Sequence, residues 1–280
     1  MENHSWLIAC GMGLLGLLVG SFLNVVIHRL PRMLHAQWAK ECAQHAHTEA
    51  PAANTFNLWT PRSGCPHCGH AIGWLENIPV LSYLWLRGRC LACHGSISGR
   101  YLVMELLTSG LFFYCGWRWG AGPSAWVWAG FAATLLALAA IDWASGLLPD
   151  ALTLPLLWAG LVSAALSWTG VVLPAALWGA VVGYLFLWAI FWAFKLCTGK
   201  EGMGYGDFKL LAALGAWLGW QSLIALILLA SVLGSIVGLT MRYRGRLGPG
   251  DYLPFGPFLA AAGFATWVLG PATLNRWIGP

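Results

Sequence analysis

The feature that most constrains this chain is a series of long apolar stretches with almost no charge. A helix that crosses a bilayer needs about 20 mainly apolar residues. Eight segments approach or meet that requirement, at residues 6–27, 101–117, 124–141, 151–168, 173–194, 208–220, 222–241 and 255–269. Only 9% of the 280 residues are charged, against about 25% in soluble globular domains. The sequence therefore predicts an all-α polytopic membrane protein. It excludes a soluble globular enzyme and argues against a nucleic-acid-binding protein.

Positive charge orients these segments in the membrane. With the N-terminus outside and all eight segments crossing, the cytoplasmic side holds 13 of the 15 Lys and Arg residues, and only Arg118 and Arg276 remain outside. This asymmetry is typical of membrane proteins. Segment 208–220 is short and carries Lys209, so a re-entrant path is an alternative for it. Without its crossing, however, the basic cluster at 242–246 would face outward, so the charge pattern favours eight transmembrane helices.

The chain divides into three parts on this topology. Residues 1–27 form the first transmembrane helix, which lacks the basic start and cleavage site of a signal peptide. Residues 28–100 form a cytoplasmic loop, in which we expect an irregular excursion at 36–56. Residues 101–280 form a membrane bundle. Glycines four residues apart, at 16/20, 179/183, 215/219 and 234/238, predict closely packed helices.

The cytoplasmic loop contains two Cys-x-x-C pairs. Cys65 and Cys68 form the first pair, and Cys90 and Cys93 follow after 21 intervening residues. Two such pairs at this separation predict one tetrahedral zinc ion. Disulfides are the competing interpretation, but a reducing compartment disfavours them. Because cysteine fills all four positions, the ion has no open site for water and is expected to be structural. The remaining cysteines, Cys10, Cys42, Cys115 and Cys197, have no paired spacing.

Acidic residues within the membrane part are functional candidates, because an ionisable group at membrane depth is costly. Six acidic residues follow residue 100: Glu105, Asp142, Asp150, Glu201, Asp207 and Asp251. Asp142 ends the third apolar segment, and Asp207 precedes the sixth in Gly204-Tyr205-Gly206-Asp207, so the topology places both at the cytoplasmic face. Two carboxylates that meet cannot both ionise easily, so one keeps its proton as general acid while the other activates water. This pair predicts an aspartyl protease.

The acidic residues also have simpler interpretations. Asp142 could be an interfacial charge, and Asp150 after Pro149 is expected to cap a helix N-terminus. Glu105 could pair with an arginine or line a cavity, and Asp251 is expected in a turn. All eight histidines lie between His4 and His94, so the bundle lacks a histidine for a serine triad or a histidine-ligated zinc site.

Taken together, these motifs are similar to those of the type IV prepilin peptidases of bacterial pilus and type II secretion systems. The resemblance covers most of the chain. It is carried by GSFLNVVIHRLP at 20–31, FNL at 56–58, PRS at 61–63, both Cys pairs, ENIPVLS at 76–82, LRGRC at 86–90, IS at 97–98, RY at 100–101, EL at 105–106, ID at 141–142, LLPD at 147–150, LT at 152–153 and GYGDFK at 204–209. Leu102 departs from the Arg-Tyr-Pro that is usual in the family, which changes the backbone restraint where the loop enters the second span.

The resemblance implies a fold and an activity. It implies eight helices in the bacterial inner membrane and a catalytic pair, Asp142 and Asp207, that faces the cytoplasm. The substrates would be prepilins or pseudopilins, whose short basic leader is removed after a glycine. Many members then methylate the new N-terminus with S-adenosylmethionine, a function associated with the Cys-bearing loop. Nothing in the residue spacing indicates where the methyl donor binds.

Two other function classes compete with the peptidase. One is a non-enzymatic membrane assembly factor that uses a zinc loop for docking. The other is a transporter, since buried carboxylates also relay protons. Proton relay favours carboxylates deep within several spans, whereas only Glu105 lies clearly inside one.

Overall fold

The computed structural model describes residues 2–47, 56–200, 202–246, 248 and 253–270. The expectations for Glu201, Asp251 and Arg276 lie outside these residues. The described part is all-helical and forms no strand, only the isolated bridges Gly64–Ala71 and Arg89–Ser96. The chain forms two compact units, unit 1 at Met1–Ala129 and unit 2 at Gly130–Pro280.

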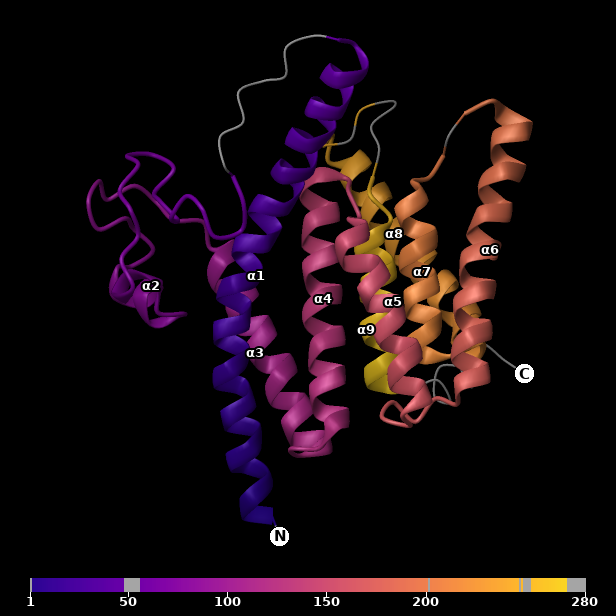
Figure 1. The fold of residues 1–280 in the computed structure, drawn as a ribbon, viewed down its shortest axis with the longest axis horizontal. Helices are drawn as coiled ribbons and strands as arrows, with labels where there is room; N and C mark the ends of the chain where they lie inside the picture. The colour runs from indigo at the N-terminus through magenta and orange to yellow at the C-terminus, as the bar shows by residue number, and fades with distance from the viewer. Residues whose placement is uncertain (1, 48–55, 201, 247, 249–252, 271–280) are drawn as a thin grey trace. The chain divides into compact units, whose positions relative to one another are not determined.

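Each of the eight apolar segments lies within a helix or overlaps one (Figure 1). The α-helices are α1 (Glu2–His45), α2 (Leu81–Trp85), α3 (Arg100–Trp119), α4 (Pro123–Ser145), α5 (Asp150–Ala165), α6 (Leu173–Thr198), α7 (Tyr205–Leu218), α8 (Leu223–Tyr243) and α9 (Gly256–Leu269), with short 3₁₀ turns η1 (Leu75–Asn77) and η2 (Trp220–Ser222).

Four helical segments are long and apolar enough to cross a bilayer, which makes this a multi-pass membrane protein. They are Ser5–His45, Pro123–Ser145, Leu173–Thr198 and Trp220–Tyr243, and the apolar helices α5 and α9 are shorter. Helix α7 has 14 residues, which extend only about 21 Å.

Helix α1 is much longer than its apolar segment. It has 44 residues and continues through Pro31 to His45, so the irregular excursion predicted for 36–56 is wrong over residues 36–45. Residues 48–55 of that stretch lie outside the described part. Good helix formers such as Met33, Leu34 and Ala36 continue the helix after the apolar pattern ends. The Gln37 side chain also donates a hydrogen bond of 2.9 Å to Glu41 one turn later.

In unit 1, α1 packs against α3 through small residues. A Cβ on Gly20 would lie 2.7 Å from the Cα of Glu105, and the Ser109 hydroxyl donates 2.9 Å to the Gly13 carbonyl. The close approach predicted from Gly16 and Gly20 is therefore confirmed.

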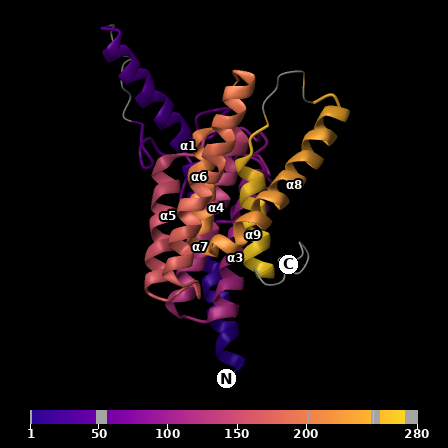
Figure 2. The ribbon, with the colours of Figure 1, turned by 90° about the vertical axis from the view of Figure 1, so that its right-hand side faces the viewer.

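In unit 2, α7 is the central helix and packs against α5, α6 and α9 (Figures 1 and 2). Every residue from Asp207 to Leu218 except Lys209 is buried. Gly179 of α6 and Gly215 of α7 are in such close contact that a Cβ on either would overlap the backbone of the other. The Trp217 indole donates 2.8 Å to the Leu156 carbonyl. A short helix with two charged residues is thus enclosed by protein.

Candidate functional site

Asp207 lies in the first turn of α7, where the chain enters the centre of unit 2. Its side chain is 3% exposed, and its carboxylate accepts a hydrogen bond from the backbone N–H of Gly204. A Cβ on Gly206 would lie only 2.7 Å from the Cβ of Leu148. The glycine therefore lets the loop after α4 lie directly against the backbone beside Asp207.

Asp142 lies near the end of α4 and is 4% exposed. The backbone N–H of Gly256, the first residue of α9, donates to its carboxylate. No group in the described part of the chain donates a hydrogen bond to its Oδ2 atom. A buried carboxylate oxygen without a donor is costly, and a catalytic role is one of the explanations for such a group in a native protein.

The structure brings Asp142 and Asp207 into one site within unit 2. The two carboxylates lie close enough to interact electrostatically. Leu148 connects the two sides, because it lies against Gly206 and also against Gly256, next to Asp142. The site is therefore built by the end of α4, its following loop, and the first turns of α7 and α9. A water molecule or a peptide carbonyl held here would meet two carboxylates at once.

Asp150 does not have the role that its sequence position predicted. Pro149 occupies the N-cap position, and Asp150 is the first residue of α5. Its carboxylate instead accepts two hydrogen bonds from the Lys209 ammonium, at 2.6 and 2.8 Å. The N-cap prediction missed this ion pair because Lys209 is 59 residues away in the sequence. The pair joins the first turns of α5 and α7 close to Asp207.

Gly256 and Leu148 belong to the site, although their sequence context did not identify them as functional. A Cβ on Gly256 would lie 2.5 Å from the Asp142 Oδ2 atom and 3.2 Å from Leu148. The available signal was the Gly-Pro pair at 256–257, which opens an apolar segment and suits a helix start. Its proximity to Asp142 depends on how α4 and α9 pack.

Glu105 is buried in the second turn of α3, in unit 1. Its Oε2 atom accepts a hydrogen bond of 2.7 Å from the Val80 backbone N–H, at the start of α2. The sequence suggested that Glu105 pairs with an arginine or lines a cavity, and this contact with the Val80 backbone is neither. Glu105 attaches the Cys-bearing loop to α3.

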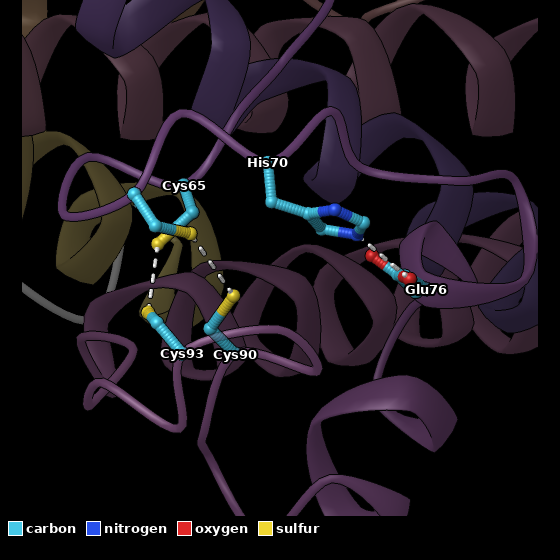
Figure 3. Close-up of polar contacts among 6 residues, drawn as sticks. Cys65, His70, Glu76, Cys90 and Cys93 are labelled. Atoms are coloured by element: carbon cyan, nitrogen blue, oxygen red, sulfur yellow. Dashed lines mark hydrogen bonds and ion pairs between the residues drawn. The ribbon is translucent and has the colours of Figure 1, made fainter.

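The four predicted metal ligands form one cluster in unit 1 (Figure 3). Their sulfur atoms all lie within 4.8 Å of one another, with Cys65–Cys93 at 3.7 Å and Cys68–Cys90 at 4.0 Å. A tetrahedral zinc ion with Zn–S bonds of about 2.3 Å places its thiolates about 3.8 Å apart. The donor set and its spacing therefore fit a metal ion. None of the eight cysteines, all in the described part, is disulfide-bonded.

The two Cys pairs adopt equivalent local structures. The N–H of Cys65 donates to the His70 carbonyl, and the N–H of Cys90 donates to the Gly95 carbonyl, both at 2.9 Å. The backbone N–H groups of Cys68 and His67 lower the pKa of the Cys65 thiol to about 7. The cluster consists of the four cysteines alone, and the His70 ring lies 3.2 Å from the Glu76 carboxylate.

The Cys68 thiol has a pKa shift in the opposite direction. The His70 backbone N–H lowers the pKa of Cys68, but desolvation and the three neighbouring thiols raise it by more, to about 12. Four thiolates at these distances repel one another, so they need a bound cation to ionise together.

Comparison with known proteins identifies both halves of the chain. The family model of the bacterial peptidase A24 N-terminal domain matches residues 14–119, and the model of the type IV leader peptidase family matches residues 129–239. Relatives named "prepilin leader peptidase/N-methyltransferase" share 53% identity in Burkholderia pseudomallei (strain 1026b), 48% in Aeromonas hydrophila and 50% in Pseudomonas aeruginosa.

These matches cover 91, 97 and 95% of this chain and 84, 94 and 91% of the respective relatives. No solved structure matches the chain. The resemblance inferred from the sequence motifs is confirmed: this chain belongs to the type IV leader peptidase family.

Proposed function

We propose that this chain is a membrane aspartyl endopeptidase that removes the basic leader from type IV prepilins or pseudopilins and methylates the new N-terminal residue. The names of its relatives support both activities. The observation that carries the peptidase assignment is the pairing of two buried carboxylates, Asp142 and Asp207, in one site of unit 2. The Asp142 Oδ2 atom is buried and has no donor in the described part, so a water molecule or substrate group that entered the site could donate to it.

The proposed mechanism divides acid and base work between the two carboxyl groups. The ionised carboxylate takes a proton from a water molecule, and the resulting hydroxide adds to the scissile carbonyl carbon. The protonated carboxyl donates its proton to the carbonyl oxygen. When the tetrahedral intermediate collapses, one of its hydroxyl groups returns a proton to the carboxylate that had donated one. The C–N bond breaks, and the leaving amine takes up the proton that came from water. Burial of both groups strengthens these interactions because it limits competition from bulk water.

The proposed topology places this chemistry at the cytoplasmic face of the bacterial inner membrane. The eight helices that correspond to the apolar segments would all cross, with the N-terminus outside and with residues 28–100 and both aspartates inside. Residues 1–27, 28–100 and 101–280 then serve as first span, metal-binding loop and peptidase bundle. The distribution of 13 of 15 basic residues supports this arrangement. A substrate could keep its basic leader in the cytoplasm while its apolar segment lies in the bilayer lipid.

Two cofactors belong to the proposal. Cys65, Cys68, Cys90 and Cys93 would hold a zinc ion, whose closed set of four thiolates suits a structural role. S-adenosylmethionine would supply the methyl group that the relatives' names require. Its binding residues are not assigned.

The proposed function is tested with purified protein, a prepilin and S-adenosylmethionine. Leader removal is followed by mobility shift, and methylation of the mature terminus by mass spectrometry. We expect cleavage that depends on the aspartates and that persists after loss of the cysteine cluster. Failure of the wild-type protein to cleave any prepilin or pseudopilin would favour the assembly-factor alternative.

Replacing Gly256 by alanine is expected to lower the rate of cleavage by roughly 100-fold, because a misplacement of about 1 Å can cost this much. The added Cβ would lie 2.5 Å from the Asp142 Oδ2 atom and force that carboxylate to move. Steady-state cleavage of a prepilin measures the effect. Gly130→Ala is the matched control, since nothing lies within 4 Å of the added atom in α4. Wild-type rates in Gly256→Ala would contradict the proposed position of Asp142.

Loss of the first Cys pair is expected to remove the metal. Wild-type protein should contain about one zinc ion per chain, and Cys65→Ser/Cys68→Ser should contain none, because two thiolates cannot close the tetrahedral site. Elemental analysis of purified protein measures this content. Cys10→Ser/Cys42→Ser is the control, since both residues lie outside the cluster. A metal-free wild type with two intact disulfides would reject the zinc assignment and the cytoplasmic placement of the loop.

A further inference from the structure

Helix α2 of the Cys-bearing loop presents an apolar face with no partner among the described residues. Leu81, Leu84 and Trp85 are 64, 61 and 73% exposed. Their spacing of three and four residues places them on one face of the helix. The other two residues of α2, Ser82 and Tyr83, are half-buried. The Tyr83 hydroxyl donates to the Ile97 carbonyl at 3.3 Å, so this side of α2 faces the loop.

The start of α2 is fixed to the α1–α3 pair. The hydrogen bond from the Val80 N–H reaches Glu105 in the second turn of α3, where Glu105 also packs against Gly20 of α1. Val80 has a φ of +62°, which is a rare conformation for a β-branched residue. Such strain persists only where surrounding contacts hold it. Figure 1 shows α2 at the side of this helix pair. With α1 and α3 crossing as proposed, α2 lies at the depth where α3 enters the bilayer.

The charge around this face is positive. Arg87 and Arg89 follow α2 directly and are exposed. Residues 56–99 contain one carboxylate, Glu76, and it contacts His70. Two further exposed tryptophans lie in this loop, Trp59 and Trp74. The ring of Trp59 is 6.0 Å from the ring of Phe22 in the first span. Tryptophan and arginine together are typical of segments that lie in the headgroup region.

We propose that α2 is an interfacial helix that docks on the anionic headgroup layer of the surrounding bilayer. Leu81, Leu84 and Trp85 enter the boundary between headgroups and acyl chains, while Arg87 and Arg89 contact lipid phosphates. Docking would hold the metal-binding loop at the membrane surface. The proposal rests on the proposed membrane crossing of α1 and α3 and is independent of the catalytic assignment.

The test places the photoreactive residue p-benzoylphenylalanine at position 85 of the full-length protein. The protein is reconstituted in nanodiscs of phosphatidylcholine alone or with phosphatidylglycerol, irradiated, and analysed by mass spectrometry for lipid adducts. The control position is Gln44, an exposed residue of α1. Along the axis of α1, Gln44 is about 25 Å from Ile27, the last residue of the first span, because the helix rises about 1.5 Å per residue. We expect lipid adducts at position 85, with a higher yield when phosphatidylglycerol is present, and none at position 44.

The arginines are tested by Arg87→Gln/Arg89→Gln in the same nanodiscs. The yield at position 85 is expected to fall by up to about fivefold per arginine when phosphatidylglycerol is present, and to stay unchanged without it. Absence of a lipid adduct at position 85, or equal yields in both nanodiscs, would overturn the proposal. If added prepilin forms an adduct at position 85 in place of lipid, the lipid proposal is also overturned. The apolar face of α2 would then be a substrate-binding surface. Leader cleavage in the same samples tests the proposed function separately.

Discussion

Asparagine in place of Asp142 or Asp207 is expected to abolish leader cleavage, with a loss of roughly 100- to 10 000-fold for either residue alone. Asparagine nearly matches the shape of aspartate, but it can neither accept a proton from water nor donate an acidic one. Both carboxylates are buried in unit 2 and act on one another, so removing one leaves the other without its partner. Mobility shift of a prepilin incubated with each purified variant measures the loss.

Asp150→Asn is the informative comparison for this experiment. Asp150 is a third aspartate near the same end of the bundle, but it is exposed and paired with Lys209. An exposed ion pair contributes up to about 1 kcal/mol, so this variant should keep most of its activity. All three variants should retain the melting behaviour of the wild type in detergent. An inactive Asp150→Asn beside an active Asp142→Asn would mean that the proposed pair is wrong.

The cysteine cluster and the helical segments could be read from sequence because local patterns encode them. Two Cys-x-x-C pairs bring their own geometry, since each pair folds into the same short turn around its thiols. Apolar runs likewise predict helices, because a backbone in lipid must satisfy its own hydrogen bonds. The expected topology put the segment ends that carry Asp142 and Asp207 at one face, and the structure brings these two residues together in unit 2.

The features that could not be predicted from the sequence depend on tertiary contacts. Gly256 lies beside Asp142 only because α9 packs at the end of α4, and Asp150 meets Lys209 only because α5 packs beside α7. The continuation of α1 to His45 was missed for another reason. Good helix formers after Ile27, such as Met33, Leu34 and Ala36, and the Gln37–Glu41 hydrogen bond continue the helix, whereas the prediction followed the long apolar pattern.

The division of the chain into two units bears on whether leader cleavage and methylation can be separated. The cysteine cluster belongs to unit 1, and Asp142 and Asp207 belong to unit 2. Two different family models match the corresponding parts of the chain. The binding energy of a structural zinc ion is mainly folding energy of its own surroundings. Loss of the ion should therefore unfold the loop and leave the helices around α7 packed.

Cys90→Ser/Cys93→Ser is accordingly expected to lose nearly all methyl transfer while leader cleavage falls only in part, since a disordered loop would slow substrate entry without moving the aspartates. Mobility shift and mass spectrometry of the mature terminus, on one sample, give both rates. Cys10→Ser/Cys42→Ser controls for the loss of two thiols outside the cluster and should keep both activities. The ratio of the two rates decides the outcome. If the Cys90→Ser/Cys93→Ser variant loses both activities to the same extent, the loop forms part of a substrate platform that both reactions share, and the activities are not separable.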